Sequence, residues 1–129
     1  WCDMRALVVD DSRAMRMMLR RTLGNLGFEV LEAEHGAAAL AVLGGNGPVD
    51  VCLVDWNMPV MDGLEFIRAV RAEPAYERMV LVMVTSESDP ARILRALMAG
   101  ADEYATKPVT PEALVDKLGL AGVAEPGGA

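Results

Sequence analysis

Five short apolar runs alternate along the chain with stretches in which apolar residues recur every three or four positions. The runs cover residues 5–9, 28–33, 51–54, 80–84 and 103–106. Runs of this length are typical of β-strands, and a spacing of three or four residues is the period of an amphipathic helix. The pattern therefore predicts five strands and five helices in alternation.

The helices expected between and after the strands carry start and stop signals. Their predicted spans are 12–26, 36–43, 63–71, 90–99 and 110–118. Asp62, Asp89 and Thr110 are expected to cap the last three helices, because a short side-chain oxygen accepts a bond from a free first-turn amide. Gly44 and Gly45 are expected to end the second helix.

The apolar pattern also predicts the order of the strands. The first, third and fourth runs are apolar on both faces, as in strands covered by helices on both sides. The second run alternates and the fifth is short and mixed, so these two are expected at the edges. We therefore predict a single doubly wound α/β domain of (βα)5 type, flavodoxin-like, with a parallel sheet of order 2-1-3-4-5.

Composition and charge narrow the class of protein. The 129 residues suffice for one domain, expected over residues 1–120, and residues 121–129 are expected to form a flexible tail or the start of a linker. A formal net charge of −7 argues against direct binding of nucleic acid. No apolar run is long enough for membrane insertion. Cys2 and Cys52 lack the spacing of a metal site or a disulfide framework, so a reducing, cytoplasmic location is expected.

Polar residues with reactive side chains follow or end the strands. They are Asp10, Asp11, Asp55, Thr85 and Lys107. Each has an ordinary interpretation by itself, such as a helix-capping loop for Asp10 and Asp11, but the carboxyl ends of parallel strands meet at one edge of the sheet. Converging carboxylates suit Mg²⁺, and Asp55 is then a candidate nucleophile toward an activated phosphoryl group. Thr85 and Lys107 would stabilise the charge of that group without any glycine-rich phosphate loop, which the chain lacks.

Four segments in this order, "LVVDDS", "LVDWNMPVMDG", "VMVTSES" and "ADEYATKPVT", resemble the receiver domain of two-component response regulators. The resemblance implies that Asp55 accepts a phosphoryl group from a sensor histidine kinase or a phosphotransfer protein. It implies a Mg²⁺ site formed by Asp10, Asp11, Asp55 and the backbone carbonyl of Asn57, with Thr85 and Lys107 on the phosphoryl group. It also implies a signalling domain of a phosphorelay rather than an enzyme.

The resemblance further implies a conformational output. Thr85 would be coupled to Tyr104, which turns inward and changes the surface of the fourth helix, fifth strand and fifth helix toward a downstream protein target. The alternative for Tyr104 is a half-buried aromatic with its hydroxyl in water. Asn57 and Glu87 would flank the site and influence the lifetime of the phosphoryl group, and together with "DWNMPVMDG" they are most similar to stand-alone chemotaxis-type (CheY-like) receivers. Such a receiver is expected to be a monomer, or to dimerise on activation.

Two features depart from the family pattern, and two alternative functions stay open. Val109 stands where the family often has Phe, and the fifth helix is expected to stop near Leu118. The first alternative is a receiver cut from a longer regulator with a DNA-binding or enzymatic output. The second is a Mg²⁺-dependent phosphatase of the haloacid dehalogenase type, although "DWNMP" lacks the DxDxT-like element.

His35 and the arginines of the first helix, Arg16 among them, are expected at the surface.

Overall fold

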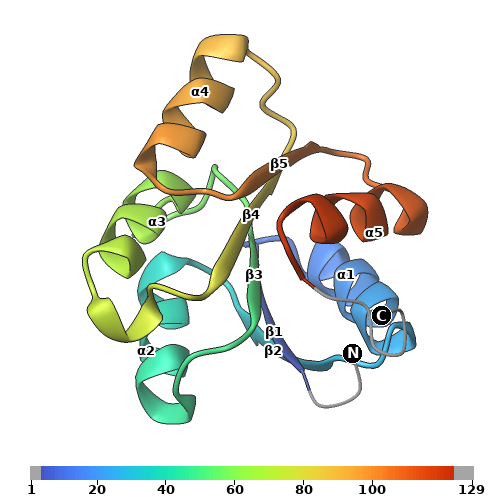
Figure 1. The fold of residues 1–129 in the computed structure, drawn as a ribbon, viewed down its shortest axis with the longest axis horizontal. Helices are drawn as coiled ribbons and strands as arrows, with labels where there is room; N and C mark the ends of the chain where they lie inside the picture. The colour runs from blue at the N-terminus through green and yellow to red at the C-terminus, as the bar shows by residue number, and fades with distance from the viewer. Residues whose placement is uncertain (1–3, 124–129) are drawn as a thin grey trace.

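Five parallel strands form one sheet in the order β2-β1-β3-β4-β5 (Figure 1). The structure is a computed structural model and describes residues 4–123. The strands are β1 (Arg5–Val9), β2 (Glu29–Ala33), β3 (Val51–Val54), β4 (Val80–Thr85) and β5 (Glu103–Thr106). The helices are α1 (Arg13–Asn25), α2 (Gly36–Asn46), α3 (Gly63–Arg71), α4 (Pro90–Ala99) and α5 (Pro111–Leu120), with an unpredicted short 3-10 helix η1 (Pro74–Tyr76). The predicted fold class and strand order are confirmed.

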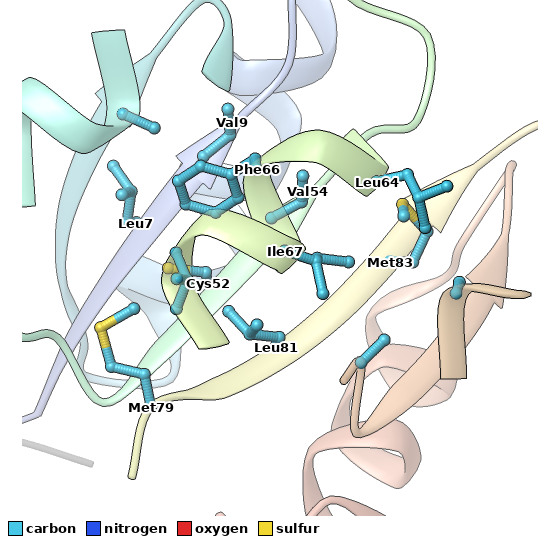
Figure 2. Close-up of a cluster of buried hydrophobic side chains, with 14 of the residues drawn as sticks. Leu7, Val9, Cys52, Val54, Leu64, Phe66, Ile67, Met79, Leu81 and Met83 are labelled. Atoms are coloured by element: carbon cyan, nitrogen blue, oxygen red, sulfur yellow. The ribbon is translucent and has the colours of Figure 1, made fainter. Parts of the chain in front are cut away.

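Helices cover both faces of the sheet. α1 and α5 lie on one face, and α2, α3 and α4 lie on the other (Figure 1). On the α3 side, Phe66 and Ile67 pack among strand side chains that include Cys52 and Leu81, all fully buried (Figure 2). Because β1, β3 and β4 are covered on both sides, their sequences are almost continuously apolar.

The predicted helix caps are present and fix where the helices after β3, β4 and β5 begin. Asp62 accepts a bond from the Glu65 amide at 2.8 Å, and the Glu65 side chain accepts one from the Asp62 amide at 3.2 Å, which forms a capping box. The Asp89 and Thr110 side chains each accept a bond from a first-turn amide, at 3.0 and 3.1 Å. These caps also anchor the carboxyl-end loops of the sheet.

Two predicted helix ends are wrong. α2 continues through Gly44 and Gly45, and α5 continues to Leu120. A glycine inside a helix costs only about 1 kcal/mol, so it does not by itself end one. The glycines that follow the helix ends are Gly47 and Gly122, whose φ angles of 79° and 91° lie in the left-handed region that favours glycine.

The described chain ends in contact with the core rather than at the end of α5. Val123 is buried beside α1 and α5, and its amide donates to the Leu118 carbonyl at 2.9 Å. The part of the expected tail from residue 124 onward lies outside the described residues, as does Cys2. Within the described residues, no helix combines the length and apolar character needed to cross a bilayer.

Candidate functional site

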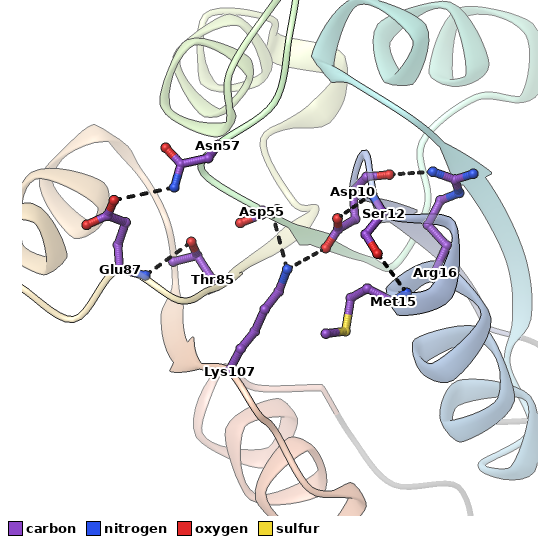
Figure 3. A network of polar contacts seen from close by, with 9 residues as sticks. All are labelled: Asp10, Ser12, Met15, Arg16, Asp55, Asn57, Thr85, Glu87 and Lys107. Carbon is purple, nitrogen blue, oxygen red and sulfur yellow. Dashed lines mark hydrogen bonds and ion pairs between the residues drawn. The ribbon is translucent and has the colours of Figure 1, made fainter.

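The residues predicted from the strand ends lie together at the carboxyl edge of the sheet (Figure 3). Asp10 follows β1, Asp55 follows β3, Thr85 is the last residue of β4 and Lys107 follows β5. The amide of Asp55 donates to the Val9 carbonyl at 2.9 Å, which continues the pairing of β1 and β3 into the site. The parallel topology therefore places four segments, distant in sequence, around one small volume.

Three carboxylates form the acidic part of the site. One oxygen atom each of Asp10, Asp11 and Asp55 lies within 4.8 Å of the others. Asp10 is 1% exposed and Asp55 8%, whereas Asp11 is exposed. Hard oxygen donors at this spacing, with one side open to water, fit a divalent cation such as Mg²⁺.

Lys107 is the cation that the chain itself supplies to these acids. Its Nζ lies 2.7 Å from Asp10 Oδ2 and 3.3 Å from Asp55 Oδ2 (Figure 3). Burial lowers the pKa of Lys107, but the hydrogen bond to Asp10 and the charge of Asp55 outweigh burial, so the pKa is raised above 10.5. The ammonium group is therefore charged at neutral pH and offsets part of the acidic charge.

The loop after Asp55 packs too closely for a side chain at Gly63. A Cβ at this position would stand 2.2 Å from the Asp55 carbonyl oxygen, and the Gly63 amide donates to the Trp56 carbonyl at 2.9 Å. Val60, in the same loop, has a φ of 68°, which is strained for a β-branched residue. The tight packing thus holds the loop that follows Asp55 in one conformation, including the strained Val60.

Thr85 and Tyr104 both bind the backbone of Glu87. Thr85 Oγ1 accepts a bond from the Glu87 amide at 3.4 Å, and the Tyr104 hydroxyl donates to the Glu87 carbonyl at 2.5 Å. Tyr104 is buried, and burial followed by the charge of Glu87 raises its pKa above 10. The alternative in which the Tyr104 hydroxyl lies in water is therefore wrong, because this hydroxyl is turned inward onto the β4–α4 loop.

Comparison with known proteins identifies the family. The sequence profile of the response regulator receiver domain matches residues 6–119. The chain belongs to this family. Membership makes it a phosphoaccepting signalling domain rather than an enzyme, so the phosphatase alternative is wrong. A receiver has a histidine kinase as phosphodonor and a downstream target, and the acidic trio is typical of a receiver Mg²⁺ site.

Similar proteins include chemotaxis receivers. The receiver is 50% identical over 116 residues to a "Chemotaxis protein CheY homolog" of Campylobacter jejuni, covering 89% of both chains. It matches the structure of chemotaxis protein CheY4 of Vibrio cholerae with a TM-score of 0.84 and 38% identity, covering 90% of this chain and 96% of that one. A Burkholderia pseudomallei response regulator, solved with a phosphorylated aspartic acid and a calcium ion, matches with a TM-score of 0.81 and 26% identity, covering 90% of this chain and 66% of that one.

Sequence reasoning missed two side-chain roles, one at the receiver site and one at the start of α2. Arg16, expected to be solvated, donates to the Asp10 carbonyl at 2.6 Å and pairs with Glu32 at 3.4 Å. His35 is the N-cap of α2, with Nδ1 accepting from the Ala38 amide at 3.0 Å. The sequence does contain a signal for the contact of Arg16 with Asp10. Arg16 lies one turn after Ser12, the cap of α1, and α1 begins at the carboxyl end of β1, where Asp10 lies.

Proposed function

We propose that this receiver is a cytoplasmic, chemotaxis-type switch that is phosphorylated on Asp55. The observation that carries the proposal is the placement of Asp55 within 4.8 Å of two further carboxylates and 3.3 Å from the Lys107 ammonium. An ionised carboxylate at the end of a buried strand is a competent nucleophile when nearby cations neutralise the incoming phosphoryl group. The similarity to chemotaxis proteins supports the choice of pathway.

The transfer step follows from the positions of these groups. A carboxylate oxygen of Asp55 attacks the phosphorus of a phosphohistidine on a sensor kinase or phosphotransfer protein, the P–N bond breaks, and the imidazole leaves with the electron pair. Lys107 neutralises charge on the transferred group, and the Thr85 hydroxyl turns from the Glu87 amide to bind one of its oxygens. Water later attacks the phosphorus, breaks the P–O bond and returns the carboxylate and inorganic phosphate.

Mg²⁺ is the cation that the acidic trio fits. Asp10, Asp11, Asp55 and the backbone carbonyl of Asn57 would hold it, and it would supply positive charge next to the phosphoryl oxygens. Both oxygens of Asp10 already accept bonds, from the Ser12 amide at 2.9 Å and from Lys107 at 2.7 Å. Asp10 is therefore assigned an indirect, water-mediated role, and Asp11, which is exposed, a direct one.

The output is assigned to the surface formed by α4, β5 and α5. Loss of the bond between Thr85 and the Glu87 amide on phosphorylation would move the loop that Tyr104 holds. α4 then carries the change to its exposed side chains Leu94 and Met98, which are available to a downstream protein target. We assign a monomeric receiver as the signalling species, which leaves this surface free.

Phosphorylation is tested by intact mass and Phos-tag mobility after incubation with acetyl phosphate, with Mg²⁺ or EDTA. The parent is expected to gain one phosphoryl group only with Mg²⁺, and Asp55→Asn none. Asp62→Asn is the matched control, because it removes a carboxylate from the same loop and keeps a capping side chain on α3. Equal labelling of the Asp55→Asn variant would overturn the assignment.

The switch is tested separately from the chemistry. Tyr104→Ala is expected to keep labelling of Asp55 but to weaken phosphorylation-dependent binding of the downstream target, whereas Tyr76→Ala, in η1, is expected to change neither. Loss of labelling in Tyr104→Ala would show that Tyr104 belongs to the phosphorylation site rather than to the output.

A further inference from the structure

Arg92 connects two of the loops that surround the phosphorylation site. It lies in the first turn of α4, and its guanidinium carbon stands 5.4 Å from the ring centroid of Trp56, the residue next to Asp55. Its Nε lies 3.8 Å from Glu87 Oε2. The Trp56 side chain is buried, so the Arg92 guanidinium lies over a fixed surface.

Glu87 is fixed at its backbone but not at its carboxylate. The backbone is held on both sides, by the Thr85 and Tyr104 hydroxyls. The carboxylate has two partners among the described residues, Asn57 Nδ2 at 3.4 Å and Arg92 (Figure 3 shows the first). Both distances are long, so the position of this acid depends on the two partners together.

Glu87 adds a third carboxylate, beside Asp10 and Asp11, to the surroundings of Asp55. Its side chain faces Asn57 across the site from the Asp10 side, where Lys107 is bound (Figure 3). Lys107 is engaged by Asp10 and Asp55 and does not contact Glu87. Arg92 is the cation that pairs with Glu87. Negative charge on Glu87 that Arg92 does not offset repels an anionic phosphodonor approaching Asp55.

We propose that Arg92 is a positioning residue that neutralises Glu87 and holds it against Asn57, and that it thereby speeds phosphorylation of Asp55 by anionic donors. The proposal rests on the proposed function, because it concerns the rate of that reaction. The side-chain contacts of Arg92 among the described residues are with Glu87 and Trp56 and not with a member of the acidic trio. Its effect on Asp55 therefore passes through Glu87 and Trp56.

The expected size of the effect is modest and depends on salt. A partly exposed ion pair changes an equilibrium or rate by about two- to fivefold at low ionic strength. Raising the salt concentration screens the charge of Glu87. The ratio of the parent rate to the Arg92→Gln rate should therefore fall toward one. A purely structural role for Arg92 would not show this salt dependence.

The test measures the initial rate of labelling by acetyl phosphate with saturating Mg²⁺, by quenching and intact mass, at low and high salt. Arg92→Gln is expected to be about two- to fivefold slower than the parent at low salt, and Arg92→Lys close to the parent. Arg95→Gln is the matched control, because it removes the same charge from an exposed position of α4 that forms no ion pair within the described chain. In a Glu87→Gln background, the Arg92→Gln change should have no further effect.

The outcomes separate this proposal from the proposed function. A parent that is not labelled contradicts the proposed function itself. A labelled parent with an unchanged Arg92→Gln rate overturns the role of Arg92, as does an equal loss of rate in the Glu87→Gln background. Matching urea midpoints of the variants show that any rate difference arises in the folded protein.

Discussion

Replacing Asp55 by asparagine should stabilise the receiver when no divalent cation is present. Asp55 is 8% exposed and shares its surroundings with two further carboxylates, whereas Lys107 is a single compensating cation. Asparagine has nearly the same shape and keeps an oxygen for Lys107. The substitution therefore removes repulsion while it leaves the packing of the loop unchanged.

The distances in the site give the size of this effect. With an effective dielectric constant of about 20, two unit charges at 4.8 Å, the upper limit for the separation of the carboxylate oxygens of the trio, repel by about 3.5 kcal/mol, and opposite charges 3.3 Å apart attract by about 5 kcal/mol. Asp55 takes part in two such repulsions and one such attraction, so the repulsion is in excess by at least about 2 kcal/mol. Screening by salt reduces the expected gain to about 1 kcal/mol.

The assay is urea unfolding in EDTA and in Mg²⁺. In EDTA the midpoint of Asp55→Asn should lie above that of the parent by about 0.5 M urea. Mg²⁺ should raise the midpoint of the parent more than that of the variant, because the cation binds the folded acidic trio. The control is Asp116→Asn, which removes a carboxylate from an exposed position of α5 and should leave the midpoint unchanged. A variant less stable than the parent in EDTA, or equal Mg²⁺ stabilisation of both, would refute the electrostatic reasoning.

Three further predictions concern individual residues of the site and core. Val60→Asn should raise the free energy of unfolding by about 1 kcal/mol, because Asn tolerates the left-handed φ that strains Val; the urea midpoint measures this, and an unchanged or lower midpoint would contradict it. Gly63→Ala should lower the free energy of unfolding by about 2 kcal/mol and slow acetyl phosphate labelling, because the new methyl group displaces the Asp55 carbonyl. Unchanged stability and labelling would show that the loop accommodates the methyl group without moving Asp55. In a Cys2→Ser background, Cys52 should resist a thiol reagent at pH 8 until urea unfolds the chain, because burial raises its pKa to about 12; rapid reaction of the folded protein would contradict this.

The elements that the sequence predicted best are those with one dominant signal. β1 and β3 have the predicted bounds because buried parallel strands need continuous apolar residues, and Asp62 caps α3 because its oxygen has a free amide to accept from. The end of α2 failed because two signals compete there. Gly44 and Gly45 lower helix propensity, but the chain turns only where φ becomes positive, at Gly47.

Site residues were likewise predicted where one signal dominates and missed where the sequence carries none. Asp10, Asp55 and Lys107 were predicted because topology alone brings strand ends together. An inward Tyr104 was predicted, but its bond to the Glu87 carbonyl was not, and neither was the contact of Arg92 with Trp56, because both depend on rotamers and on the angle at which α4 leaves its loop. Such contacts have no periodicity in the sequence, so they become visible only when the helix is placed.

The distance in sequence between the contacting groups of the site has a consequence for biosynthesis. Lys107 binds an acid that precedes it by 97 residues, and its second acid precedes it by 52. A chain emerging from the ribosome therefore carries Asp10, Asp11 and Asp55 long before their cation is available. Until β5 has been translated and has joined the sheet, the nascent chain has the nucleophile but not the neutralising charge. The nascent chain should thus be unable to take up a phosphoryl group before Lys107 has been translated and β5 has joined the sheet.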